Sequence, residues 1–202
     1  MPDFDILASE WDTPRRRDRA EQIAGHIRRQ LDGGTRAMEY GCGTGLVGFP
    51  LHDCFESLVF VDSSPVMLDI VGEKIRKLAR DGLTTFCGSY QNLPFSAESF
   101  DCIFTSMVIH HIPDTAALFS IFFRLLSPGG KLIVVDLNRD DGSFHADEPD
   151  FDGHHGFDLS SLQKLCRETG FRRCEAETIF QGERQVSGRT VAYSLFLLTA
   201  EK

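Results

Sequence analysis

The sequence predicts one α/β domain with a doubly wound sheet of about seven strands, mostly parallel, with an antiparallel hairpin at the carboxyl end. Three observations predict it. Short β-rich runs alternate with helical patterns, which is typical of a parallel sheet covered by helices on both faces. A glycine-rich turn follows the first strand. Two β-rich runs joined by a short link close the chain, which indicates an antiparallel pair.

The strand predictions depend on runs of β-branched and aromatic residues, which pack well on a pleated surface. The expected strands are residues 36–40, 57–61, 83–87, 100–106, 131–137, 171–180 and 190–200. Residues 181–189 are expected to link the last two strands at the sheet edge.

Helices are expected where a capping side chain precedes apolar residues at helical spacing. The start signals are Thr13-Pro14, Ser64-Pro65, Asp114 and Asp158, and the stop signals are Gly33-Gly34, Gly82 and Gly170. Residues 138–156 show neither pattern and read as a long loop. Loops of that length in a compact domain are typically lids or binding loops.

The composition is that of an ordinary globular protein, with 202 residues, 42% of them hydrophobic and 25% charged. The formal net charge of -9 disfavours a nucleic-acid partner, because phosphate backbones are repelled. The basic cluster of Arg15, Arg16, Arg17 and Arg19 is interpreted as the solvated face of a helix.

Six cysteines show no CxxC spacing, so the sequence predicts neither a zinc motif nor a redox motif. The first residues lack a basic segment followed by an apolar one, as a secretory signal would have. No apolar run is long enough to span a bilayer. We therefore expect a cytoplasmic monomer or homodimer that does not contact membranes.

Two carboxylates flank the glycine-rich turn at residues 41–45 (GCGTG). Glu39 precedes it, and Asp62 ends the next strand, where a carboxylate can accept both hydroxyls of a ribose. The spacing is Gly-x-Gly-x-Gly and not the Gly-x-Gly-x-x-Gly of dinucleotide sites. Glu39 would repel a pyrophosphate and attract a cationic amine, so a ligand with an amino-acid end, a ribose and an adenine fits better than NAD.

These residues resemble the class I S-adenosylmethionine-dependent methyltransferases, a Rossmann-like family. The resemblance extends in order over five blocks, residues 38–45 (MEYGCGTG), 60–68 (FVDSSPVML), 88–95 (GSYQNLPF), 100–103 (FDCI) and 126–132 (LSPGGKL). It implies S-adenosylmethionine as cofactor and S-adenosylhomocysteine as product.

The resemblance also implies roles for single residues. Glu39 would contact the methionine amine, and Asp62 would hold the ribose hydroxyls. The methionine and ribose would be lined by Gly41, Cys42, Gly43 and Gly45, and Thr44 of the same turn is also expected to contact the cofactor. The remaining expected cofactor contacts are Ser63, Met67, Ser89, Tyr90 and Thr105. Ser89 departs from the family pattern, which often has an acidic residue there, so its contact to the adenine amino group would be weaker.

Histidines supply the expected catalytic groups, because histidine exchanges protons near neutral pH. His110 and His111 follow a strand at the sheet edge where ligands bind. Alternatively, either one only shapes its loop. His155 lies in an HHGFD segment that resembles one found in small methyltransferases. No metal site is expected, with His154 and His155 among carboxylates as the alternative.

We thus expect one domain over residues 1–202, with a helical lid (1–34), a cofactor-binding core (35–137), an acceptor-side loop (138–157) and a terminal helix and hairpin (158–202). Trp11 would be part of the lid, or alternatively of the core. The expected activity is direct methyl transfer to a small-molecule acceptor. A NAD(P)-dependent oxidoreductase and a catalytically silent binding protein of the same fold remain alternatives.

Overall fold

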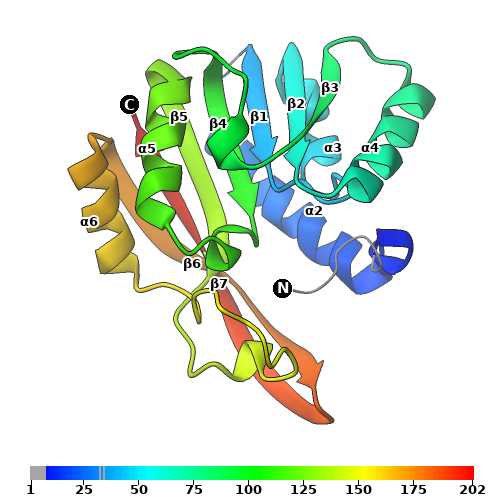
Figure 1. Cartoon of the computed structure of the whole chain (residues 1–202), viewed down its shortest axis with the longest axis vertical. Coiled ribbons are helices and arrows are strands. Elements are labelled where there is room, and N and C mark those ends of the chain that lie inside the picture. Colours follow the sequence, from blue (N-terminus) through cyan, green and yellow to red (C-terminus); the bar gives the residue numbers. More distant parts are fainter. Residues whose placement is uncertain (1–7, 32, 34) are drawn as a thin grey trace.

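A single seven-stranded sheet organises the computed structural model, which describes residues 8–31, 33 and 35–202. The strand order is β3-β2-β1-β4-β5-β7-β6 (Figure 1). The strands are β1 (Arg36–Tyr40), β2 (Ser57–Asp62), β3 (Leu83–Cys87), β4 (Phe100–Ser106), β5 (Leu126–Leu137), β6 (Arg172–Val186) and β7 (Arg189–Glu201). The first five strands pair in parallel, and β7 pairs antiparallel with both β5 and β6. The expected fold class is confirmed.

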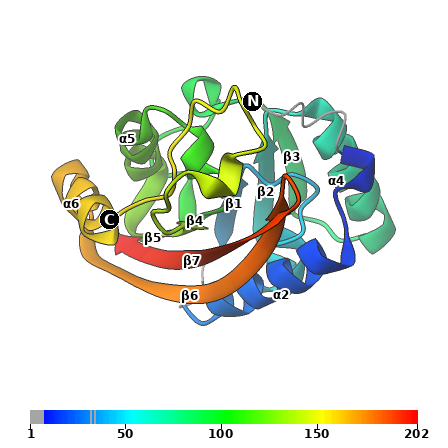
Figure 2. The same ribbon diagram turned by 90° about the horizontal axis from the view of Figure 1, so that it is seen from below.

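Helices cover both faces of the sheet. Helices α2 (Pro14–Arg28) and α4 (Pro65–Leu78) pack in one core, and α5 (Thr115–Leu125) and α6 (Leu159–Thr169) pack in the other. Figure 2 shows α2 beneath the sheet and α5 above it. Successive strand residues such as Ala37 and Met38 belong to opposite cores, as the two-residue period of a strand requires. None of the described helices is long and apolar enough to cross a bilayer.

The four helix starts expected from the sequence are confirmed by hydrogen bonds. The side chains of Thr13, Ser64, Asp114 and Asp158 each accept from a backbone N–H three residues onward. The Gly170 stop is also confirmed, with a φ of 114°. The other two stops are wrong. α2 ends at Arg28, before the glycines, of which Gly34 lies outside the described residues. α4 ends at Leu78, before Gly82 is reached, and Ala79 adopts the left-handed conformation there.

The link expected over residues 181–189 is also wrong, because most of it is strand. β6 continues to Val186, and β7 begins at Arg189. Ser187 and Gly188 alone make the turn, with φ of 48° and 77°. Two residues at positive φ match the twist of the flanking strands and so allow the hairpin to continue.

The lengthened hairpin extends beyond the rest of the sheet (Figure 1). The 3-10 turn η5 (Ser143–His145) lies in the expected long loop and packs against both β6 and β7. A bridge between Asn138 and Phe157 closes the base of this loop. The hairpin and the loop thus place side chains from the last third of the chain beside the carboxyl ends of the parallel strands.

Candidate active site

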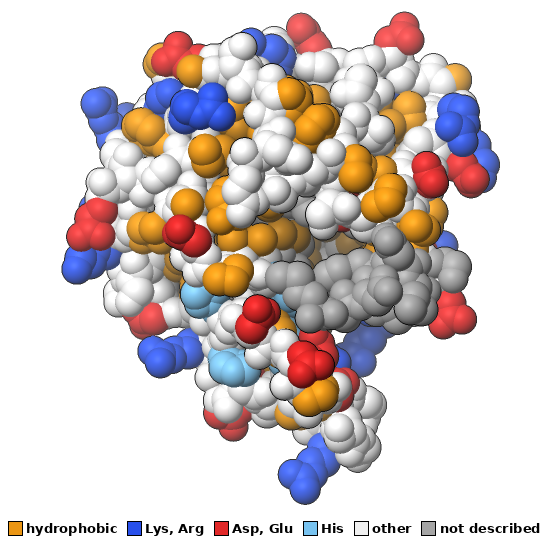
Figure 3. Space-filling model, in the orientation of Figure 1, with side chains coloured by type: hydrophobic (Ala, Val, Ile, Leu, Met, Phe, Trp, Pro, Cys, Tyr) orange, Lys and Arg blue, Asp and Glu red, His pale blue; other side chains and the backbone are white. Residues whose placement is uncertain are grey.

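A cavity of about 990 Å³ lies at the carboxyl ends of the parallel strands, around the point where the strand order reverses between β1 and β4. Ligands of open α/β sheets bind at this position. The wall includes Gly41 after β1, Asp62 at the end of β2 and Ser106 at the end of β4. Figure 3 shows hydrophobic side chains gathered across the middle of this face, with histidines below them.

Asp62 holds the glycine turn in place. Its Oδ2 accepts from the N–H of Gly43 at 2.7 Å, and its Oδ1 accepts from the N–H of Ser64 at 2.9 Å. Gly41 has a φ of 69°, and a Cβ there would lie 2.3 Å from a methyl carbon of Val108. The turn therefore requires glycine for its conformation and for close packing against the loop after β4.

Glu39 places a buried carboxylate at the back of the cavity. The residue is 2% exposed, and its Oε2 has no hydrogen-bond partner among the described residues. Burial, and then the charge of Asp62, raises the pKa of Glu39 well above its ordinary value. A buried carboxylate oxygen without a partner is costly. A cationic group bound in the cavity would remove that cost.

Most of the cofactor contacts expected from the sequence line the cavity. They are Glu39, Gly41, Cys42, Gly43, Asp62, Ser63, Met67, Ser89 and Tyr90. Their contacts to a cofactor stay a prediction.

Thr44, Gly45 and Thr105 lie outside the cavity lining. The Thr44 hydroxyl donates to Asp12, which also pairs with Lys74 at 2.8 Å. Thr105 is fully buried within β4. In these positions, the side chains of Thr44 and Thr105 contribute to packing and turn geometry.

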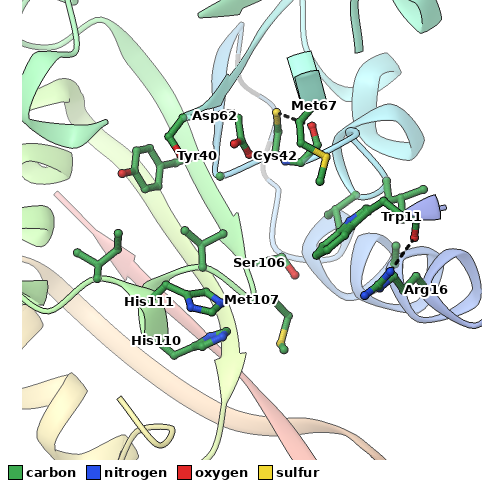
Figure 4. Close-up of a pocket in the computed structure, with 18 of the residues that line it drawn as sticks. Trp11, Arg16, Tyr40, Cys42, Asp62, Met67, Ser106, Met107, His110 and His111 are labelled. Carbon is green, nitrogen blue, oxygen red and sulfur yellow. Dashed lines mark hydrogen bonds between the residues drawn. The ribbon is translucent and has the colours of Figure 1, made fainter. Parts of the chain in front are cut away.

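Histidines form the opposite end of the cavity. In Figure 4, Tyr40, Cys42 and Asp62 lie at one end, and His110 and His111 lie side by side at the other. His145 from η5 completes this wall, with its ring centroid 5.1 Å from that of His110. Burial, and then the charge of His110, lowers the pKa of His111 to about 4 and that of His145 to about 3. Both rings are therefore neutral at physiological pH.

His110 is fixed by a buried carboxylate. Its Nδ1 lies 2.5 Å from Oδ1 of Asp136, and the two residues are 1% and 0% exposed. Burial opposes ionisation of Asp136, but the His110 ring and several hydrogen bonds outweigh it and lower the pKa of Asp136. The pair orients the imidazole and leaves Nε2 as its second functional atom.

His155, the third expected catalytic residue, lies elsewhere. Its side chain is exposed and does not line the cavity, and its ring packs over Gly142. Its catalytic role stays a prediction. His145 lines the cavity but was not among the expected site residues. A loop without periodicity gives no signal of which of its histidines points inward.

A group of basic side chains also lines the cavity, a position that the expected solvated helix face did not include. Arg15, Arg16 and Arg19 of α2 face the cavity, as does Arg184 of the hairpin. Arg16 lies 4.0 Å over the ring of Trp11, and Arg19 donates to the Tyr193 hydroxyl at 3.2 Å. Only Arg17 of the expected cluster lies outside the lining. Arg15 and Arg17 are exposed, as a solvated helix face requires, whereas Arg16 and Arg19 are half-buried.

Comparison with known proteins identifies the family. Residues 38–134 match the model of the methyltransferase domain family. An uncharacterized methyltransferase of Schizosaccharomyces pombe is 31% identical over 157 residues, which cover 70% of this chain and 55% of the relative. The chain belongs to the class I S-adenosylmethionine-dependent methyltransferase family. The chain spans 55% and 66% of the length of two curated relatives that it matches.

Solved methyltransferases share the fold. An S-adenosylmethionine-dependent methyltransferase from Thermotoga maritima superposes with a TM-score of 0.74 at 22% identity, covering 98% of each chain. Phosphoethanolamine N-methyltransferase 2 of Haemonchus contortus, solved with phosphomonomethylethanolamine and S-adenosylhomocysteine, gives 0.71 at 22% identity over 85% of this chain and 49% of that one. Membership of a methyltransferase family argues against the oxidoreductase alternative.

Proposed function

We propose that this methyltransferase-family chain binds S-adenosylmethionine in the cavity and transfers its methyl group to a small-molecule acceptor. The observation that carries the proposal is the buried Glu39 carboxylate beside the glycine turn, whose Oε2 has no hydrogen-bond partner among the described residues. Asp62 lies across that turn. The methionine ammonium would pair with Glu39, and the ribose hydroxyls would donate to Asp62. The adenine would lie between Met67 and the segment that contains Ser89 and Tyr90.

The methyl group needs no further activation, because the sulfonium charge already makes it electrophilic. The protein has to align the acceptor behind the methyl carbon and exclude water. Met107 and Val108 precede the two histidines in the chain, and both line the cavity. Val108 also lies against Gly41 of the glycine turn. His110 and His111 would hold and activate the acceptor.

Positive charge in the cavity wall favours an acceptor with an anionic group. The lining includes four arginines, Arg15, Arg16, Arg19 and Arg184, and two carboxylates of the long loop, Asp147 and Glu148. Arg184 already pairs with Asp147 at 3.0 Å, whereas Arg16 and Arg19 donate hydrogen bonds to neutral oxygens, a backbone carbonyl and a tyrosine hydroxyl. Guanidinium groups suit carboxylate and phosphate. The phosphomonomethylethanolamine in the Haemonchus contortus structure is of that chemical class.

Transfer of radiolabelled methyl from S-adenosylmethionine to a metabolite collection tests the proposal. The collection should contain anionic compounds and matched neutral analogues. We expect label in a small anionic product, with Arg19→Gln lowering acceptor affinity but not S-adenosylhomocysteine affinity. Cofactor binding without transfer to any acceptor would instead support the catalytically silent alternative.

Glu39→Gln is expected to change stability and cofactor affinity in opposite directions. A raised carboxyl pKa means that the folded state holds its proton to higher pH than the unfolded chain. Stability is therefore lost as pH rises from the ordinary 4.5 to the raised value. Glutamine removes that loss, so the ligand-free variant should melt above wild type at about pH 8 but not below about pH 4. Its affinity for S-adenosylhomocysteine should fall about tenfold, since a charge-assisted bond is lost.

Thermal melting at several pH values and calorimetry with S-adenosylhomocysteine measure the two effects. Glu56→Gln is the control, because Glu56 is exposed and lies outside the cavity. A Glu39→Gln variant with a lower melting temperature and unchanged affinity would contradict the assignment of Glu39 to the cofactor amine.

A further inference from the structure

Three histidines from two separate segments converge on the acceptor end of the cavity. One ring nitrogen from each of His110, His111 and His145 lies within 4.8 Å of the other two. We propose that these nitrogens form a binding site for one divalent transition-metal ion such as Zn²⁺. The role of this ion in activating the acceptor rests on the proposed function, whereas its binding can be tested without any cofactor. The sequence predicted no metal site, and its alternative was a different pair of histidines, His154 and His155.

The contact between His110 and Asp136 is the first support. Histidine ligands of metals almost always donate their other ring N–H to a carboxylate or carbonyl, which fixes the tautomer. Nδ1 of His110 lies 2.5 Å from Asp136 Oδ1, so Nε2 is the nitrogen left to bind a metal. Asp136 is itself fixed, because its Oδ2 accepts from the backbone N–H groups of Val108 and His110.

The second support is the buried environment of His145. The residue is 4% exposed, and its Nδ1 has no hydrogen-bond partner among the described residues. The ring is held by stacking on Phe151, with centroids 3.8 Å apart and planes 4° apart. An unsatisfied buried polar atom is destabilising, and a bond to a metal ion would remove that cost.

The donor set selects the class of ion. Neutral imidazole nitrogens suit Zn²⁺, Co²⁺, Ni²⁺ and Fe²⁺, whereas Mg²⁺ and Ca²⁺ prefer oxygen. Bonds of 2.0–2.1 Å to one tetrahedral ion require nitrogens ~3.3 Å apart, so the rings must close by on the order of 1 Å. The remaining coordination position would face the cavity, where Glu148 has a buried Oε2 without a hydrogen-bond partner among the described residues.

A metal ion at this position would bind an acceptor hydroxyl or amine and lower its pKa. The acceptor would release a proton to solvent, and its lone pair would form the bond to the methyl carbon. The carbon–sulfur bond would break with its electron pair going to sulfur, which gives S-adenosylhomocysteine. His110 would then act as a ligand through Nε2 and not as a free base.

Co²⁺ titration of chelator-treated protein, followed by visible absorption, tests the site. We expect one Co²⁺ per chain, with the intense bands of a four- or five-coordinate nitrogen site and without the charge-transfer band of sulfur ligation. Zn²⁺ should displace it, and Mg²⁺ should not. His145→Phe keeps the ring stacking on Phe151 and removes the ligand. The affinity of the His145→Phe variant for Co²⁺ should fall by more than the roughly 10–100-fold expected for Asp136→Asn, which removes only the orienting carboxylate.

His26→Ala is the matched control, because His26 lies in α2 outside the cavity lining, and it should bind Co²⁺ like wild type. Calorimetry with S-adenosylhomocysteine on the metal-free proteins shows, independently of the metal, whether each variant is folded and still binds the cofactor product. Co²⁺ uptake that is absent, or equal in wild type and a His145→Phe variant that still binds S-adenosylhomocysteine, would overturn the metal site and leave the proposed function intact. If His145→Phe does not fold, His111→Leu decides in the same way.

Discussion

Asp62→Ala is expected to weaken S-adenosylhomocysteine binding by on the order of 100-fold or more. Hydrogen bonds to a charged group contribute about 1.5–3 kcal/mol each, and the carboxylate would accept from both ribose hydroxyls. The same carboxylate anchors the N–H groups of Gly43 and Ser64, so the turn itself would also loosen. Titration calorimetry measures the affinity, and thermal melting measures the accompanying loss of stability.

Asp101→Ala is the control for Asp62→Ala, because it removes a carboxylate that supports the fold and does not contact the ligand. Asp101 lies in β4 outside the cavity lining and accepts from the backbone N–H groups of Thr35 and Arg36. This variant should lose stability without losing affinity. Equal affinity in the Asp62→Ala and wild-type proteins would remove Asp62 from the ribose site.

Gly43→Val is expected to abolish measurable cofactor binding. Gly43 has a φ of 52°, and Trp11 Nε1, at 3.5 Å, is the only atom of the described residues beyond its chain neighbours that a Cβ there would meet within 4 Å. The added side chain would therefore take up cavity space beside the turn. Left-handed backbone costs roughly 1–2 kcal/mol for a residue with a Cβ, so the melting temperature should also fall.

Gly129→Val carries the same backbone strain at an open position. Its φ is 76°, and none of the described residues lies within 4 Å of the place that a Cβ would take. Both variants should be destabilised, but only Gly43→Val should fail to bind S-adenosylhomocysteine in calorimetry. Normal binding by Gly43→Val would show that the cofactor does not lie against this turn.

The sequence predicted the parallel half of the fold well, because its signals are local. Capping side chains such as Ser64 act within three residues of themselves, and strand runs such as 36–40 have a two-residue period. The errors occurred where the deciding contact is distant. Ala79 ends α4 in place of Gly82, which packs against the carbonyl of Glu56. The hairpin continues through residues 181–186 (QGERQV), which give little hydrophobic signal, and two of them, Arg184 and Gln185, line the cavity.

The placement of the cofactor-side residues, and of His110 and His111 on the acceptor side, was likewise predictable, whereas that of His145 and Arg184 was not. Glu39, Gly41 and Asp62 lie at fixed places after parallel strands, so their convergence follows from topology. His145 and Arg184 reach the cavity through a loop and a strand extension whose paths depend on tertiary packing. Long-range contacts of this kind leave no periodic trace in a single sequence.

We propose above all that the glycine turn, Glu39 and Asp62 together bind an S-adenosyl nucleoside. The decisive measurement is titration calorimetry of the folded wild-type chain with S-adenosylhomocysteine, with NADH as the comparison ligand. Saturable binding at one site per chain, absent for NADH, is the expected result. No heat with S-adenosylhomocysteine from protein that melts cooperatively would contradict the claim.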